Sequence, residues 1–163
     1  MALDRSWIEQ HIPHKGRMCL LDEVLNWDAT QIRCRSATHR TRDNPLRAYG
    51  RLGAVCGIEY AAQAMAVHGA LVGASAPLAS SMSEQVRDSL GAAVGYLASV
   101  RSVTLHVGRL DDLPSDLIAC AARLAGDART VLYEFSVSCA QRIVLEGRAS
   151  IVIDQNFGIT VPS

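Results

Sequence analysis

The stretch Gly57-Ile58-Glu59-Tyr60-Ala61-Ala62-Gln63-Ala64-Met65-Ala66-Val67 decides the fold of this chain. Its alanines and long apolar side chains favour a helix, which we expect to run to Gly73. The helix would be apolar on nearly every side, and a helix of that kind is normally buried inside its domain. The sequence therefore predicts a central helix over 57–73 that the rest of the chain encloses.

Glu59 is the only acidic residue between Asp43 and Glu84, and it lies near the start of this helix. Burying an unpaired charge costs several kcal/mol, roughly, unless the group is paired or stays protonated. The pattern favours a catalytic acid. The alternative is a first-turn glutamate that faces solvent and complements the helix dipole, which is worth about 0.3–1 kcal/mol.

Length and composition predict one domain over residues 1–163. The chain has 163 residues, 49% of them hydrophobic, so it can bury a core without disulfides or metals. Sixteen basic residues balance sixteen acidic ones, which argues against a nucleic-acid partner. No apolar signal core and no stretch of about 18 apolar residues is found, so we expect no membrane span and a cytoplasmic protein.

The five cysteines are odd in number and widely spaced, which is typical of reduced thiols rather than of disulfides. They are Cys19, Cys34, Cys56, Cys120 and Cys139. No CxxC motif or Cys/His cluster is present, so the sequence predicts neither a metal site nor a cofactor.

Strand patterns dominate the remainder of the chain. A short helix is predicted over Asp4–His11, an irregular loop over Arg40–Gly53, and a serine-rich mobile loop or lid over 75–91. The predicted strands are Met18–Trp27, Gln31–Ala37, Val94–Leu110, Leu117–Leu124, Val131–Ala140 and Ile143–Val152. Two strands, an apolar helix and then further hairpin strands predict an α+β fold, with a curled antiparallel sheet wrapped around one long central helix.

Several segments resemble a known family. The segment from Ile12-Pro13-His14-Lys15-Gly16 to Val24 resembles the opening of the hotdog-fold β-hydroxyacyl-acyl-carrier-protein dehydratases of fatty-acid synthesis, and Glu59-Tyr60-Ala61-Ala62-Gln63 is similar to the Glu-x-x-Ala-Gln start of their central helix. Residues 44–47, 50–52, 57–69 and 109–113 resemble the dehydratase-like subunit encoded in aryl polyene biosynthesis clusters.

The resemblance implies a hotdog fold and the dehydration of 3-hydroxyacyl thioesters. The substrate would be an acyl chain held by 4'-phosphopantetheine on an acyl carrier protein. The partners implied are this carrier protein and a second hotdog subunit, in a homodimer or in a heterodimer with another hotdog dehydratase.

The chemistry needs an acid, a base and donors for the thioester carbonyl. By the resemblance, Glu59 supplies one catalytic group, and the helix N-terminus, with the N–H groups of Gly57 and Ile58, faces the carbonyl. Gln63 lies one turn further on the same face and can hold the Glu59 carboxyl by a hydrogen bond.

The family's Gly-His-Phe-Pro segment, which carries the catalytic histidine, is missing here. No histidine lies between His39 and His68. His14, in a loop bounded by Pro13 and Gly16, is the first candidate base and His39 the second, with a surface or capping histidine as the alternative for each. His68, on the predicted helix, is assigned to the tunnel wall or to helix packing.

Three other residues are candidates for substrate binding. Tyr60 either lines the pocket or packs in the core. Arg47 and Arg51, in the loop before the helix, can meet the phosphate of pantetheine or can simply be solvated.

Three functions remain open on the sequence. The first is dehydration of carrier-bound 3-hydroxyacyl chains in fatty-acid or aryl polyene biosynthesis. The second is a non-catalytic or half-catalytic hotdog subunit that supports a partner dehydratase. The third is an acyl thioesterase, because a helix-borne glutamate can also activate water against a thioester.

Overall fold

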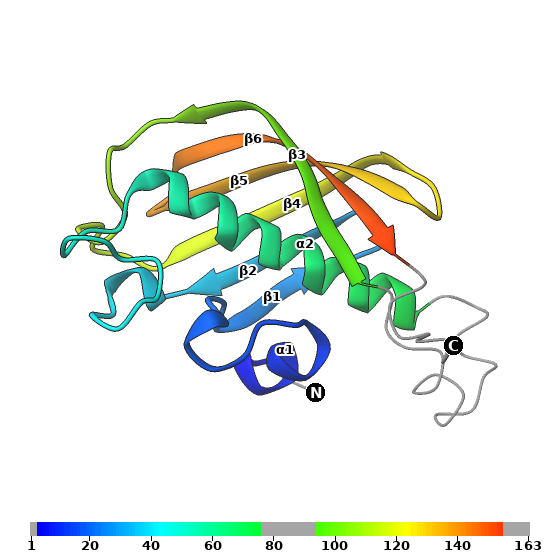
Figure 1. Ribbon diagram of the computed structural model, residues 1–163, viewed down its shortest axis with the longest axis horizontal. Helices are drawn as coiled ribbons and strands as arrows, with labels where there is room; N and C mark the ends of the chain where they lie inside the picture. The colour runs from blue at the N-terminus through cyan, green and yellow to red at the C-terminus, as the bar shows by residue number, and fades with distance from the viewer. Residues whose placement is uncertain (1–2, 76–93, 155–163) are drawn as a thin grey trace, which may run out of the picture.

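Six antiparallel strands form one curled sheet around a long helix in the computed structural model, which describes residues 3–75 and 94–154 (Figure 1). The strand order is β1-β2-β4-β5-β6-β3, and every neighbouring pair is antiparallel. The strands are β1 (Glu23–Trp27), β2 (Gln31–Ser36), β3 (Val94–Leu105), β4 (Leu117–Gly126), β5 (Thr130–Cys139) and β6 (Arg142–Asp154). The predicted α+β fold class is confirmed.

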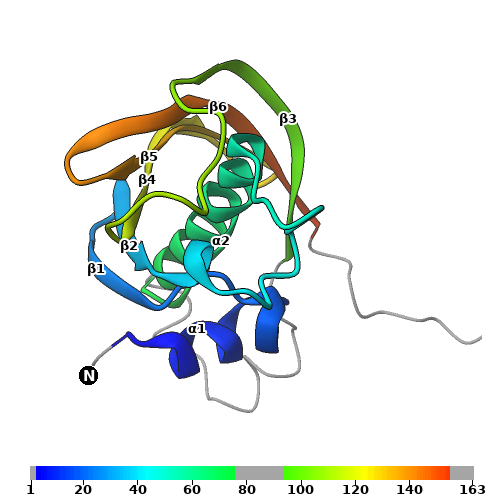
Figure 2. The same cartoon turned by 90° about the vertical axis from the view of Figure 1, so that its left-hand side faces the viewer.

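Helix α2 (Gly57–Ala74) lies in the concave face of the sheet, and Figure 2 shows the strands curving around it. It ends one residue beyond the predicted end. Its buried side chains are small or apolar on most sides, among them Ala61, Ala64 and Val67. Small side chains let the twisted sheet approach the helix closely, so the helix forms the centre of the core.

The stretch Ala54–Ala74 is the one helix of the described residues that is long and apolar enough to cross a membrane, by length and composition alone. Half of that stretch is buried inside the fold. The buried core helix of a soluble protein passes the same test, so the finding is weak evidence for a membrane span.

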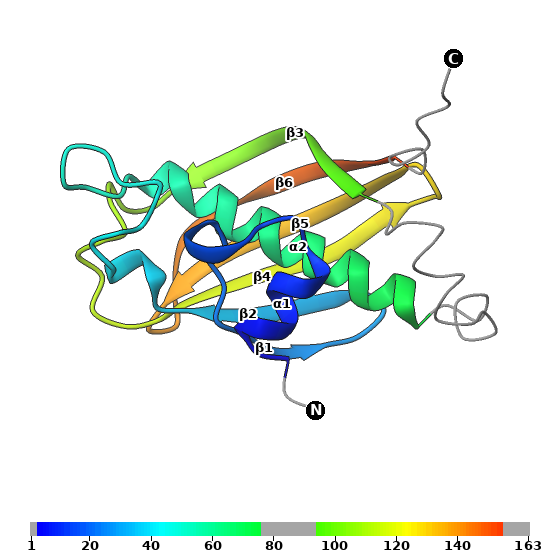
Figure 3. The ribbon, with the colours of Figure 1, turned by 60° about the horizontal axis from the view of Figure 1, so that its bottom comes forward.

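Helix α1 (Arg5–His11) lies on the open side of α2, away from the sheet (Figure 3). The Asp4 carboxylate caps it by accepting a hydrogen bond of 3.0 Å from the N–H of Trp7. The helix ends before Ile12, as the Ile12-Pro13 pair predicts. The loop that follows α1 passes close to the first turn of α2, where His14 meets Glu59.

The predicted strand over Met18–Trp27 is wrong in its first half. Gly16–Met18 forms a short 3-10 helix, and β1 begins only at Glu23. The peptide of Leu20 bonds to side chains instead of to a strand, because its N–H donates to Gln63 and its carbonyl accepts from Ser36 and Thr38. Apolar composition alone cannot distinguish such a buried extended segment from a strand.

The long strand predicted over Val94–Leu110 is also too long, because β3 ends at Leu105. The following residues pair with the loop before α2, where Ala54 N–H donates to Gly108 O at 3.1 Å and Leu110 N–H donates to Leu52 O at 2.8 Å. The other strands agree with prediction to within two residues. The predicted lid over 75–91 lies outside the described residues except for Ser75.

Candidate functional site

Glu59 lies in the first turn of α2 and meets His14 across 45 residues of sequence. His14 Nε2 is 3.1 Å from Glu59 Oε1. The end of α1 at Ile12 turns the chain so that the loop carrying His14 passes over the start of α2. The structure thus brings together the two residues that the sequence proposed as catalytic.

Gln63 holds the Glu59 carboxyl from the next turn of the helix. Its Nε2 donates to Glu59 Oε1 at 3.1 Å and to Met18 O at 2.8 Å. Its Oε1 accepts the Leu20 N–H at 2.8 Å. A main-chain N–H can only donate, so this bond fixes which end of the amide carries oxygen and makes Gln63 a donor to Glu59.

Both donors meet the same oxygen of Glu59. Within the described residues, Oε2 has no recorded hydrogen bond, and the side chain is 35% exposed. The hydrogen bond from His14 lowers the pKa of Glu59 below its usual range, burial partly opposes this, and Gln63 lowers it further. Glu59 is therefore a carboxylate near neutral pH, with one oxygen available to a reactant, rather than a carboxylic acid.

His14 presents its Nε2 to Glu59, and its side chain is 28% exposed. Its Nε2 is at the carboxylate, and its Nδ1 is buried with no hydrogen-bond partner among the described residues.

Gly57 does not supply the unpaired donor that the sequence argument assigned to it. A 3-10 turn over Ala54–Cys56 runs directly into α2, and the Gly57 N–H donates to the carbonyls of that turn. Gly57 is needed for space instead, because a Cβ there would lie 2.0 Å from Cδ2 of the buried Leu145. The partly buried side chain of Ile58 packs against the core.

Tyr60 is completely buried, and its hydroxyl bonds to other protein groups. The hydroxyl is 2.9 Å from Thr38 Oγ1 and accepts from Asn44 Nδ2 at 3.0 Å. Of the two sequence interpretations, this geometry supports packing.

The two loop arginines differ in what they contact. Arg47 donates to the carbonyls of Thr41 at 2.9 Å and Gly50 at 3.3 Å, and its guanidinium lies 3.9 Å from the Asp111 carboxylate. Arg47 thus stabilises the conformation of the loop in which it lies. Arg51 has an exposed side chain with no recorded polar partner within the described part of the chain.

His39, the second candidate base, and His68 are both buried, and each bonds groups other than Glu59. His39 is fully buried, and its Nε2 lies 3.2 Å from Leu113 O. His68 Nδ1 bonds the Tyr133 hydroxyl and Nε2 bonds Asp28 O, both at 2.8 Å. Burial lowers the pKa of both histidines, which favours neutral rings in structural roles.

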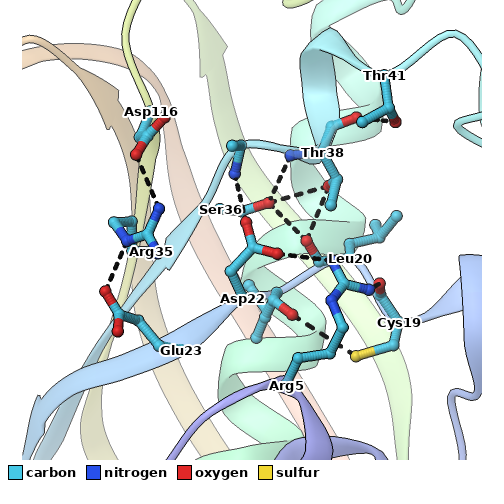
Figure 4. Close-up of polar contacts among 12 residues, drawn as sticks. Arg5, Cys19, Leu20, Asp22, Glu23, Arg35, Ser36, Thr38, Thr41 and Asp116 are labelled. Carbon is cyan, nitrogen blue, oxygen red and sulfur yellow. Dashed lines mark hydrogen bonds and ion pairs between the residues drawn. The ribbon is translucent and has the colours of Figure 1, made fainter.

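Sequence reasoning missed the residues that fasten the segment Cys19–Asp22 beneath the site (Figure 4). Arg5 donates to Cys19 O at 2.6 Å and to Asp22 Oδ1 at 2.7 Å, and the Ala37 N–H donates to Asp22 Oδ2 at 2.7 Å. These partners are 14 to 17 residues apart in sequence, and no local pattern signals them.

A surface hollow of about 390 Å³ lies beside this segment, walled by α1, the turn at Gly16 and the loop at 38–45. Neither Glu59 nor His14 lines it. The described residues contain no group of three or more His, Cys, Asp or Glu side chains placed to hold a metal ion. The five cysteines are free thiols.

Solved structures share this architecture. The dehydratase heterocomplex ApeI:P from Xenorhabdus doucetiae matches with a TM-score of 0.71 at 22% identity, over 90% of each chain. An HP0420 homologue from Helicobacter felis matches with a TM-score of 0.59 at 10% identity, over 92% of this chain and 91% of that one. A mutant thioesterase PA1618 from Pseudomonas aeruginosa matches with a TM-score of 0.52 at 11% identity, over 80% and 79%. These likenesses confirm the hotdog fold.

The sequence comparisons give a narrower result. No curated protein matches the chain. The model of the ApeP-like family, described as ApeP dehydratase, matches residues 6–158, which is nearly the whole chain. The resemblance to the dehydratase-like subunit of aryl polyene clusters is thereby confirmed, and the chain belongs to the ApeP-like dehydratase family.

Proposed function

We propose that this chain is the Glu59-bearing subunit of a dehydratase that removes water from 3-hydroxyacyl thioesters on an acyl carrier protein in aryl polyene biosynthesis. Its family supports a dehydratase role. The observation that carries the proposal is the geometry of Glu59, whose Oε1 is held by His14 and Gln63 and whose Oε2 has no hydrogen bond recorded within the described residues. The lowered pKa of Glu59 agrees with an ionised carboxylate.

The open carboxylate oxygen suits the first proton transfer of the reaction. Glu59 Oε2 takes the α-proton of the thioester, and the electrons of that C–H bond form the Cα–Cβ double bond. The bond from Cβ to the hydroxyl oxygen breaks, and the leaving oxygen takes a proton to become water. That proton returns from the newly formed Glu59 carboxylic acid or comes from a second acid.

A second subunit is the best source of that second acid. His14 is already bound to Glu59 through Nε2, and its Nδ1 is buried, so it is placed to orient the carboxylate. The ApeI:P assembly of Xenorhabdus doucetiae, which shares this fold, is a dehydratase heterocomplex. We therefore propose that a partner hotdog dehydratase pairs with this chain and faces Glu59.

Two features of the surface support such a partner. β3 ends the strand order, so within the described residues one side of it pairs with no strand. The apolar side chains of Val55, one turn before Glu59, and of Met18 are 58% and 47% exposed. A partner subunit or an acyl chain would cover them. Arg51 is free to meet the pantetheine phosphate.

The thioesterase alternative keeps one specific support. An ionised glutamate with an open oxygen can also deprotonate water for attack on a thioester. The same assay separates the two reactions. Dehydration removes water, so the product stays on the carrier and is lighter by about 18 mass units, whereas hydrolysis releases a free acid.

The test uses Glu59→Gln with Glu134→Gln as its matched control. Glu134 is exposed on β5, so the control removes the same charge away from the site. Each variant is purified alone and after co-expression with a partner hotdog protein, and mass spectrometry follows a carrier-bound 3-hydroxyacyl chain. Glu59→Gln should fold and lose about 10²–10⁴-fold in turnover, because an amide cannot carry the proton.

Two results would contradict the proposal. Turnover retained by Glu59→Gln in the presence of the partner removes the role of Glu59, and release of free acid assigns a thioesterase. His14→Ala separates the two subunit models. Full activity of the unpartnered chain would exclude a supporting subunit, and its loss in His14→Ala would show that this chain's own histidine is the one required.

A further inference from the structure

Hydrogen bonds and the main chain of Leu20 connect buried Asn44 to the Glu59 carboxylate. The members, in order, are Asn44, Tyr60, Thr38, Leu20, Gln63 and Glu59, and the Leu20 carbonyl and N–H belong to two adjacent peptide groups joined by the Leu20 Cα. The five links measure 3.0, 2.9, 2.8, 2.8 and 3.1 Å. Apart from Glu59 at its end, none of these groups faces the open carboxylate oxygen.

Donor and acceptor chemistry fixes the direction of the first links. Asn44 Oδ1 accepts the Leu46 N–H at 2.9 Å, so its Nδ2 is the donor to Tyr60. The Tyr60 hydroxyl accepts from Asn44, so its own proton goes to Thr38 Oγ1, the other group recorded against it. The Thr38 hydroxyl then donates to Leu20 O or to Ser36 Oγ, and Ser36 Oγ itself donates to Leu20 O.

The last links run in the same direction. The Leu20 N–H can only donate, so Gln63 receives it on Oε1 and donates from Nε2 to Glu59. The two halves of the series meet at Leu20 through its Cα, so Tyr60 acts on Gln63 by fixing the position of this main chain.

We propose that Tyr60 is a positioning residue: through Thr38 it fixes the main chain at Leu20, whose N–H fixes the Gln63 amide, and Gln63 then holds Glu59 Oε1 and leaves Oε2 for the reacting proton. This rests on the proposed function of Glu59. Tyr60 touches no substrate in this role. The direction in which Gln63 shifts the pKa of Glu59, downward, agrees with a donor held against the ionised form.

The groups that face Glu59 are few. His14 is the titratable one recorded against it in the described part of the chain, from the loop after α1, and Gln63 is its neutral neighbour on α2. Because His14 is in direct contact with the Glu59 carboxylate, the test must separate its effect from that of Gln63.

The test compares Tyr60→Phe with Tyr133→Phe. Each removes one hydroxyl from a buried tyrosine, but the Tyr133 hydroxyl bonds His68 and has no link to Glu59. The carboxyl carbons of glutamate are labelled with carbon-13, and NMR follows the Glu59 signal, assigned by its loss in Glu59→Gln, through an acid titration. The titration is repeated with each tyrosine variant in a His14→Gln background.

Tyr60→Phe should raise the pKa of Glu59 in both backgrounds, and Tyr133→Phe should leave it unchanged. Thr38→Val, which removes the bond to Leu20 O directly, should raise it further. Active enzyme should show the same order in the acid limb of kcat/KM, with KM unchanged. An unchanged titration in Tyr60→Phe, or an equal shift in Tyr133→Phe, overturns the proposal.

The NMR measurement does not need turnover, so it also separates the two proposals. If the chain proves to have no dehydratase activity but Tyr60→Phe shifts the Glu59 titration, the proposed function fails and the positioning role stands. If activity depends on Glu59 but the pKa of Glu59 is unchanged in Tyr60→Phe, only the positioning role fails.

Discussion

Replacing Gln63 by leucine should destabilise the fold and disturb the site together. Gln63 is fully buried and makes three hydrogen bonds, two of which bind the main chain of the 18–20 segment to α2. Leucine has a similar size but leaves the buried Leu20 N–H without an acceptor, at a cost of about 1–3 kcal/mol. Met18 is exposed, so water can replace part of the bond to its carbonyl.

The expected loss is therefore about 2–3 kcal/mol in the free energy of unfolding. Urea denaturation measures this loss, and the dependence of the free energy of unfolding on urea concentration should stay unchanged. Gln31→Leu is the control, since Gln31 is exposed and its side chain bonds only Asp28, and it should stay within about 0.5 kcal/mol of the wild type. If Gln63→Leu also stays within that range, the Leu20 N–H finds another partner and the anchoring argument is refuted.

Two further predictions concern stability. Burial lowers the pKa values of His39 and His68, so on acidification the unfolded chain takes up protons before the folded chain does. The contribution of these two histidines to the free energy of unfolding is therefore fully present above about pH 6.5 and is lost as the pH falls below it. His68→Gln should reduce that slope by about 1.4 kcal/mol per pH unit in urea melts, and an unchanged slope would contradict a neutral buried His68. Gly57→Ala should cost about 1–3 kcal/mol because its Cβ overlaps Leu145, whereas Gly69→Ala, with no atom within 4 Å, should stabilise α2 by about 0.5–1 kcal/mol; equal thermal shifts in the two variants would contradict the packing argument.

Local patterns in the sequence were sufficient for most of the fold. The apolar, alanine-rich composition of 57–73 predicts the buried helix, and alternating hairpin segments predict β4, β5 and β6. The failures occurred where the chain is extended but bonded to distant groups. The segment 18–22 looks like a strand in composition, and only its bonds to Gln63 and Ser36 show that it is not one.

The sequence by itself determined that Glu59 would lie at the start of a buried helix with Gln63 one turn away, because both facts follow from helical periodicity. Only the tertiary structure decided that His14 is the histidine at the carboxylate, that His39 is buried elsewhere, and that the Gly57 N–H is already paired. The physical reason is the distance in sequence between the residues that interact. Periodicity relates residues within a few turns, whereas the contact between His14 and Glu59 depends on how α1 and its loop pack against α2, and no local pattern encodes that packing.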